Sequence, residues 1–328
     1  MLPVIRLFSF PLFVALLIGA TPAQAELQVL TSIKPLQLIA AAVQDGAGEA
    51  DVLLPTSASA HHYTLRPSDV RRLQGATLFY WIGADLENFL PRALDGRKGP
   101  SVAIQDLPGL SLRHFGDAHE QAEEHDERDH GHDHGHEHDE HGDEDADAHD
   151  HDHRPGSLDA HLWLLPANAR VIAERMAADF AAADPANAER YRANSAVFAA
   201  RTEALDQRLQ QRLAGIQGKP FFVFHQAYDY FEAAYGLRHS GVFSVGSEVQ
   251  PGARHVATMR QRLQQAGPSC VFSEPPTRPR LAETLTSGLP VKMAELDVLG
   301  IEQTVDAQGY ERLVEELGTT LAECLETL

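Results

Sequence analysis

In the first third of the chain, short apolar runs alternate with stretches whose apolar residues recur at helical spacing. The run 77–82 is apolar on both faces, which is typical of a strand buried inside a parallel sheet. Leu36, Ile39 and Val43 recur at three and four residues, which is typical of one face of a helix. Strands that alternate with helices predict βαβ units. The predicted strands are 27–33, 51–55, 77–82 and 101–104, and the predicted helices are 35–43 and 66–73.

The same alternation returns after residue 217 and continues to the end of the chain. It therefore predicts a second lobe with an architecture similar to the first. The predicted strands are 221–224, 239–243, 270–272 and 291–294, and the predicted helices are 228–235, 253–266, 280–287 and 309–325.

Two helices are predicted between these parts, at 166–184 and 185–216. In the second, apolar residues recur at seven, four and three residues as far as Ile216, so we expect one helix about 45 Å long. A helix of this length is longer than one lobe requires, so we expect it to connect two lobes. The predicted fold class is thus α/β, with an N-terminal lobe at 26–184, a connecting helix at 185–216 and a C-terminal lobe at 217–328.

The N-terminus has the pattern of a secretory signal peptide. Arg6 precedes the apolar run 7–20, and the small residues Ala23 and Ala25 fit a cleavage site before Glu26. The alternative is an uncleaved anchor, but the apolar run is short for a bilayer span. We expect residues 1–25 to be removed and the protein to be exported to the periplasm.

Composition changes abruptly at residues 117–153, where eleven histidines and seventeen Asp or Glu residues occur with a single arginine. This segment contributes −16 to the formal charge of −20, so acidity is local, and no basic patch favours a nucleic-acid partner. Its lack of apolar residues predicts a disordered, metal-attracting loop, with a merely solvated acidic run as the alternative. The predicted weak metal ligands are His130, His132, His134, His136 and His138.

The chain has two cysteines, Cys270 and Cys324. Export to an oxidising compartment favours a disulfide between them over two free thiols. Such a bond would tie the last helix to an internal strand.

Three histidines outside the acidic segment share a context. His61 follows the predicted strand 51–55, His161 lies where the ordered pattern resumes, and His225 directly follows the strand 221–224. Ligands of open α/β sheets bind beyond the carboxyl ends of the strands. If the lobes face each other, the three imidazoles form a zinc site with a fourth position open to water or a carboxylate. For each histidine taken alone, a hydrogen-bonded structural role is the alternative.

Four stretches of the chain resemble conserved blocks of the ZnuA-type family, the periplasmic solute-binding proteins of bacterial zinc ABC importers. The resemblance covers essentially the whole mature chain, including a histidine-rich insertion. It implies two lobes joined by a rigid helix and one Zn²⁺ in the cleft between them. It also implies a monomeric, non-enzymatic receptor that delivers zinc to a membrane permease. The four stretches are 58–69, 159–164, 224–231 and 271–275.

Carried over to this chain, the resemblance implies that His61, His161 and His225 are the metal ligands. Zinc-type members are similar in having histidine at the position of His225, where manganese-type relatives have a carboxylate. It also implies the disulfide between Cys270 and Cys324.

The chain departs from the family pattern around the first ligand. The family commonly has aspartate where this chain has His62, which makes His62 an alternative ligand. Some members have a glutamate ligand where this chain has Ala60, so the fourth position falls to water or to Asp297. Glu274 is expected beside the site rather than on the metal.

Three other functions compete with the zinc receptor. A manganese receptor of the same family is disfavoured by the third imidazole, and a zinc buffer or chaperone would act through the acidic segment alone. A zinc hydrolase would need a general base, and the sequence has neither a His-Glu-x-x-His motif nor a nucleophile elbow.

Overall fold

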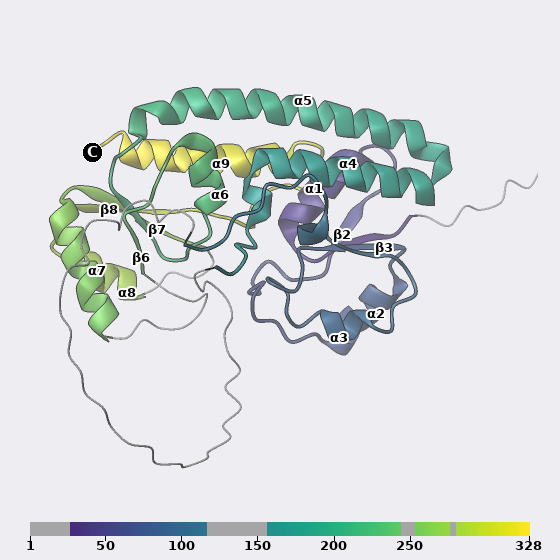
Figure 1. The fold of residues 1–328 in the computed structure, drawn as a ribbon, viewed down its shortest axis with the longest axis horizontal. Coiled ribbons are helices and arrows are strands. Elements are labelled where there is room, and N and C mark those ends of the chain that lie inside the picture. Colours follow the sequence, from purple (N-terminus) through teal and green to yellow (C-terminus); the bar gives the residue numbers. More distant parts are fainter. Residues whose placement is uncertain (1–26, 117–155, 244–252, 276–279) are drawn as a thin grey trace, which may run out of the picture.

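The computed structural model describes residues 27–116, 156–243, 253–275 and 280–328. They form two parallel four-stranded sheets that are flanked by helices and joined by one long helix (Figure 1). The predicted fold class is therefore confirmed. The predicted signal peptide and the acidic segment 117–153 lie outside the described residues. Within the described ranges, no helix has the length and apolar character needed to cross a membrane.

The first sheet has the strand order β2-β1-β3-β4, with every neighbouring pair parallel. All four residues of β3 are buried, as the run of apolar residues predicted. Its strands are β1 (Val29–Thr31), β2 (Ala50–Val52), β3 (Leu78–Trp81) and β4 (Ser101–Ala103), and its helices are α1 (Lys34–Gln44), α2 (Pro67–Gly75) and α3 (Pro91–Leu94).

The second sheet repeats this topology, with the parallel order β6-β5-β7-β8. The strand predicted at 239–243 is shorter than expected, because His239 is hydrogen-bonded to Glu232 instead of to a neighbouring strand. The strands are β5 (Phe221–Val223), β6 (Gly241–Val242), β7 (Ser269–Ser273) and β8 (Val291–Glu295), and the helices are α6 (Asp229–Tyr235), α7 (Ala253–Ala266), α8 (Arg280–Thr286) and α9 (Gly309–Leu325).

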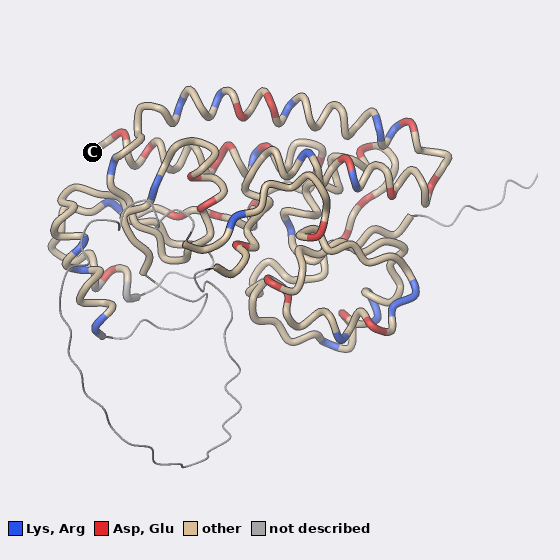
Figure 2. Tube along the Cα trace, in the orientation of Figure 1, with Lys and Arg blue, Asp and Glu red and all other residues tan. Residues whose placement is uncertain are grey.

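Helix α4 (Pro166–Ala183) leads into α5 (Ala188–Leu213), which has a short 3₁₀ turn at each end. At 1.5 Å per residue the 26 residues of α5 span about 39 Å. Its predicted apolar positions are buried against α4, α1 and α9, and it runs along one edge of the molecule (Figure 1). Positively and negatively charged residues are interspersed along α5 and along the chain of both lobes (Figure 2).

Helix α9 follows the second sheet in sequence but packs against α1 of the first lobe as well as against α5. The Tyr310 hydroxyl donates to the Trp163 carbonyl at 2.8 Å, and Trp163 Nε1 donates to the Val298 carbonyl at 2.9 Å. One hydrophobic core therefore includes residues from both sheets. The two lobes are held together by packing as well as by α5, and division at residues 184 and 217 stays a sequence-based prediction.

Cys270 of β7 and Cys324 of α9 form a disulfide bond, which confirms the predicted pairing. The bond fixes the C-terminal helix to an interior strand of the second sheet.

Glu87 is a fully buried carboxyl group at the carboxyl ends of β1 and β3. It accepts hydrogen bonds from the Ser32 hydroxyl and from the backbone N–H groups of Ile82 and Gly83. Burial raises the pKa of Glu87 to about 7, although these hydrogen bonds oppose the rise. The group therefore titrates near neutral pH.

Because the pKa of Glu87 is higher in the folded than in the unfolded state, its contribution to stability is complete below about pH 4.5 and is lost as the pH rises through about 7. We expect this group to lower the free energy of unfolding by on the order of 3 kcal/mol between pH 4.5 and pH 8. Urea denaturation at several pH values measures this. Glu87→Gln should flatten the curve, and parallel curves for the two proteins would contradict the assignment.

Candidate metal site

Three imidazoles converge where the two lobes meet. His61 lies in the loop between β2 and α2, His161 precedes the 3₁₀ turn Leu162–Leu164, and His225 follows β5. One ring nitrogen from each lies within 4.8 Å of those of the other two. The ring centroids are 4.9 Å apart for His161 and His225, 5.4 Å for His61 and His225, and 5.5 Å for His61 and His161. The structure thus brings together the three histidines that the sequence analysis selected.

A tight turn at Ser59 places the adjacent residues His61 and His62 in different environments. The backbone N–H groups of His61 and His62 both donate to the Ser59 hydroxyl, at 3.2 and 3.3 Å. His61 is buried with 6% of its surface exposed, whereas His62 is exposed and is not part of the three-histidine group. The local backbone therefore places the ring of His61 beside those of His161 and His225.

A buried carboxylate orients His161. Asp159 Oδ1 lies 2.8 Å from His161 Nδ1 and also accepts the His161 backbone N–H at 3.0 Å. When Asp159 is ionised, its oxygens only accept hydrogen bonds, which places the imidazole proton on Nδ1 and leaves the Nε2 lone pair for a cation. Burial raises the pKa of Asp159, and the backbone hydrogen bond opposes that rise. A cation on Nε2 would favour the ionised form of Asp159.

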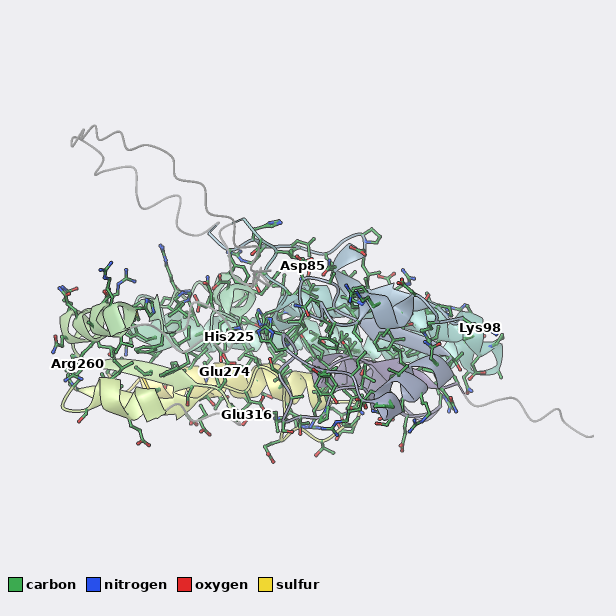
Figure 3. The ribbon with its side chains drawn as sticks, turned by 90° about the horizontal axis from the view of Figure 1, so that it is seen from below. Asp85, Lys98, His225, Arg260, Glu274 and Glu316 are labelled. Atoms are coloured by element: carbon green, nitrogen blue, oxygen red, sulfur yellow. A yellow bond between two sulfur atoms is a disulfide. The ribbon has the colours of Figure 1, made fainter. Side chains whose placement is uncertain are left out.

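In the second lobe, a carboxylate likewise lies beside the Nδ1 atom of His225. Its Nδ1 lies 3.2 Å from Glu274 Oε2, and the Tyr228 hydroxyl lies 3.1 Å from Glu274 Oε1. Figure 3 shows His225 and Glu274 next to each other near the middle of the molecule. Burial and the charge of Glu274 raise the pKa of Tyr228, so Tyr228 remains a hydrogen-bond donor. Glu274 therefore stands beside the site, as expected.

The three imidazoles suit a tetrahedral Zn²⁺ with one open position. Zinc–nitrogen bonds of about 2.0–2.1 Å place tetrahedral ligands roughly 3.4 Å apart. The ring nitrogens lie within 4.8 Å of one another, so each pair needs to approach by no more than about 1.4 Å. Three neutral imidazoles add no charge, so the bound ion keeps its full charge and attracts water or an anion to the fourth position.

Asp297, the other candidate ligand, does not join this group. Its Oδ1 accepts the backbone N–H of Leu299 at 3.0 Å, and its Oδ2 accepts that of Ile301 at 2.5 Å. Burial raises the pKa of Asp297, and these hydrogen bonds oppose the rise. The carboxylate therefore closes a turn. The five candidate loop histidines, His130 to His138, lie outside the described residues.

Two features were missed by the sequence analysis. Asp159 was given no role, although its position two residues before His161 was a usable signal. A second group of potential ligands, formed by Asp229, Glu232 and His239, was not anticipated. The spacing of Asp229 and Glu232, three residues apart on one helix face, could have indicated it.

Replacing Asp159 by asparagine should weaken zinc binding by about 10- to 100-fold, because loss of the negative charge makes the His161 imidazole a weaker ligand. Competition titration against a zinc chelator measures the change. Asp184→Asn is a matched control, since Asp184 accepts hydrogen bonds from Asn187 and Tyr191 and belongs to neither group of candidate ligands. Equal affinities for the Asp159 variant and the unchanged protein would contradict the orienting role.

Comparison with known proteins matches nearly the whole chain to one protein family. Residues 29–324 match the family model described as "Zinc-uptake complex component A periplasmic". The chain is 36% identical over 321 residues to a "High-affinity zinc uptake system protein ZnuA" of Yersinia pestis, with 95% of each chain covered. It is 34% identical over 326 residues to a protein of the same name from Brucella abortus, with 97% of this chain and 98% of the relative covered.

Solved structures show the same fold. A crystal structure described as ZnuA superposes with a TM-score of 0.71 and covers 91% of this chain and 99% of its own. At 20% sequence identity, this likeness concerns the fold alone.

Proposed function

The chain belongs to the family of periplasmic zinc-uptake components, and on this basis we propose that it is a zinc receptor that delivers Zn²⁺ to the membrane permease of an ABC-type importer. The resemblance found in the sequence is thereby confirmed. The observation that carries the proposal is the convergence of three imidazoles, two of them held by a carboxylate at Nδ1.

In this proposal His61, His161 and His225 bind the ion. Water takes the fourth position, because both oxygens of Asp297 already accept backbone hydrogen bonds. His62 is not assigned, because its side chain is exposed. Since binding requires neutral imidazoles, zinc affinity should fall as the pH drops below about 6.

Zinc is favoured over manganese by the chemistry of the ligands. Imidazole nitrogen suits zinc, whereas carboxylate and carbonyl oxygens suit manganese. Competition between the two ions for the same protein tests this choice, and tighter binding of manganese would favour the manganese receptor.

The family is a transport component rather than an enzyme family. We propose that the receptor releases Zn²⁺ unchanged and acts as a monomer in the periplasm after cleavage before Glu26. Turnover of an ester panel by the zinc-loaded protein would instead support a hydrolase.

The acidic segment 117–153 is assigned an accessory role: weak binding of several ions and supply of zinc to the three imidazoles. Residues on either side of the segment lie together, because His114 and Leu158 form an antiparallel bridge and the Phe115 N–H donates to the Ser157 carbonyl at 3.0 Å. Leu158 of this bridge is followed directly by Asp159, and His161 comes two residues later.

Deletion of residues 117–153 separates a receptor from a buffer. The closed ladder at its base allows a short connector to replace the segment. We expect one tight zinc equivalent to remain after deletion, with slower loading under zinc limitation. Loss of all tight binding would favour a buffer that acts through the segment, and an unchanged loading rate would contradict the supply role.

A further inference from the structure

A second cluster of potential ligands lies on the C-terminal lobe, between α6 and β6. We propose that Asp229, Glu232 and His239 form a second divalent-cation site, separate from the three imidazoles. One ligand atom from each residue lies within 4.8 Å of those of the other two. Asp229 and Glu232 are three residues apart on α6 and therefore share a helix face. The inference does not depend on the proposed transport function.

The cluster is held in place by the backbone. The His239 N–H donates to Glu232 Oε2 at 3.0 Å, and His239 Nδ1 lies 2.8 Å from Glu232 Oε1. His239 Nδ1 is 3.8 Å from Asp229 Oδ1, and Gln226 Nε2 donates to Asp229 Oδ2 at 2.8 Å. The side chains of His239, Glu232 and Asp229 are only 9%, 6% and 13% exposed. A cation would therefore meet ligands that are already positioned and largely desolvated.

An independent observation comes from Asp159. It is fully buried, and among the described residues its Oδ2 has no hydrogen-bond partner. The Tyr230 hydroxyl donates to the Asp159 backbone carbonyl at 2.9 Å, so Asp159 lies against α6, the helix that carries Asp229 and Glu232. An unpartnered buried oxygen beside this helix is stabilised by a nearby cation.

Two fixed positive charges lie within electrostatic reach of the cluster: Arg113 acts on Asp229, and Arg238 acts on His239. Burial by itself would lower the pKa of His239, but the hydrogen bond and charge of Glu232 and the charge of Asp229 produce a net rise. A bound cation therefore replaces the proton of His239.

Competition between the cation and the proton of His239 determines the affinity of the second site and its dependence on pH. Because the proton must leave, the second site binds more weakly than the three imidazoles, and its affinity rises with pH. One imidazole with two carboxylates suits zinc and also manganese. We choose Zn²⁺ as the probe.

Zinc stoichiometry of the full mature chain tests the proposal. At pH 8, the variant Asp229→Asn with His239→Gln should bind one equivalent fewer than the unchanged protein, with the tight equivalent retained. Asp184→Asn with His255→Gln is the matched control, because Asp184 and His255 lie outside both ligand groups, and it should bind the same number as the unchanged protein. Equal stoichiometry in all three proteins would overturn the proposal.

Anomalous diffraction at the zinc edge keeps the test decisive if the double variant does not fold. Crystals of the unchanged protein soaked in zinc should show a peak between Asp229 and His239, in addition to one among the three imidazoles. Absence of the first peak would overturn the second site. Absence of the peak among the imidazoles would instead contradict the proposed function, so the two failures are distinguishable.

Discussion

The His161→Ala variant will bind zinc about 100- to 1,000-fold more weakly than the unchanged protein. Zinc sites with four ligands hold the ion with about 10–16 kcal/mol, so one ligand contributes roughly 2.5–4 kcal/mol. A factor of ten in affinity corresponds to about 1.4 kcal/mol. His161 has 2% of its surface exposed and its Nδ1 is already paired with Asp159, so the imidazole is held in place for the ion and its loss should be costly.

His62→Ala is the matched control for this prediction. It also removes one imidazole, but His62 is exposed and lies outside the three-histidine group. Competition titration at pH 7.5 should give the His62 variant the affinity of the unchanged protein. If His62→Ala loses tight binding while His161→Ala keeps it, the ligand assignment is wrong.

Loss of the disulfide should have the largest effect on stability. Replacing Cys270 and Cys324 by alanine opens a loop of 54 residues, and the entropy of loop closure predicts a loss of about 4 kcal/mol in the free energy of unfolding. The zinc ligands are not changed, so zinc affinity in the folded protein should be retained. Denaturant titration measures the stability difference.

Reduction of the unchanged protein provides the control. With the bond reduced, its unfolding midpoint should move to that of the double variant, and a reductant should have no further effect on the variant. A double variant as stable as the oxidised protein would show that packing of α9 on α1 and α5 already holds the C-terminal helix.

Much of the fold is predictable because local patterns dominate it. In α5 the residues Tyr191, Phe198, Leu205, Leu209 and Leu213 recur at seven and four positions, and all are buried. A continuous apolar run likewise predicts the fully buried β3.

The packing of α9 across the lobes was not predictable in the same way. Its apolar face is compatible with either sheet, and only the assembled structure shows that Tyr310 reaches the Trp163 carbonyl. The strand order was also open, because the local pattern predicts strands without fixing which strands are neighbours.

The candidate site shows the same division between local and long-range information. The three histidines could be selected because each follows a predicted strand or lies in a stretch that resembles a known family. The distances between the three histidines could not be predicted, since they depend on how the two lobes pack. The proposal that His61 and not His62 binds the ion rests on the turn at Ser59, and the proposal that Asp297 does not bind it rests on two backbone hydrogen bonds.

X-ray absorption at the zinc edge tests the central claim most directly. With one molar equivalent of Zn²⁺ on the full mature chain, the three-imidazole site predicts three nitrogen ligands at about 2.0–2.1 Å with the outer-shell scattering of imidazole rings, and one oxygen. The His161→Ala variant should show one imidazole fewer. A spectrum with fewer than three imidazoles, or one that the substitution leaves unchanged, would contradict the account.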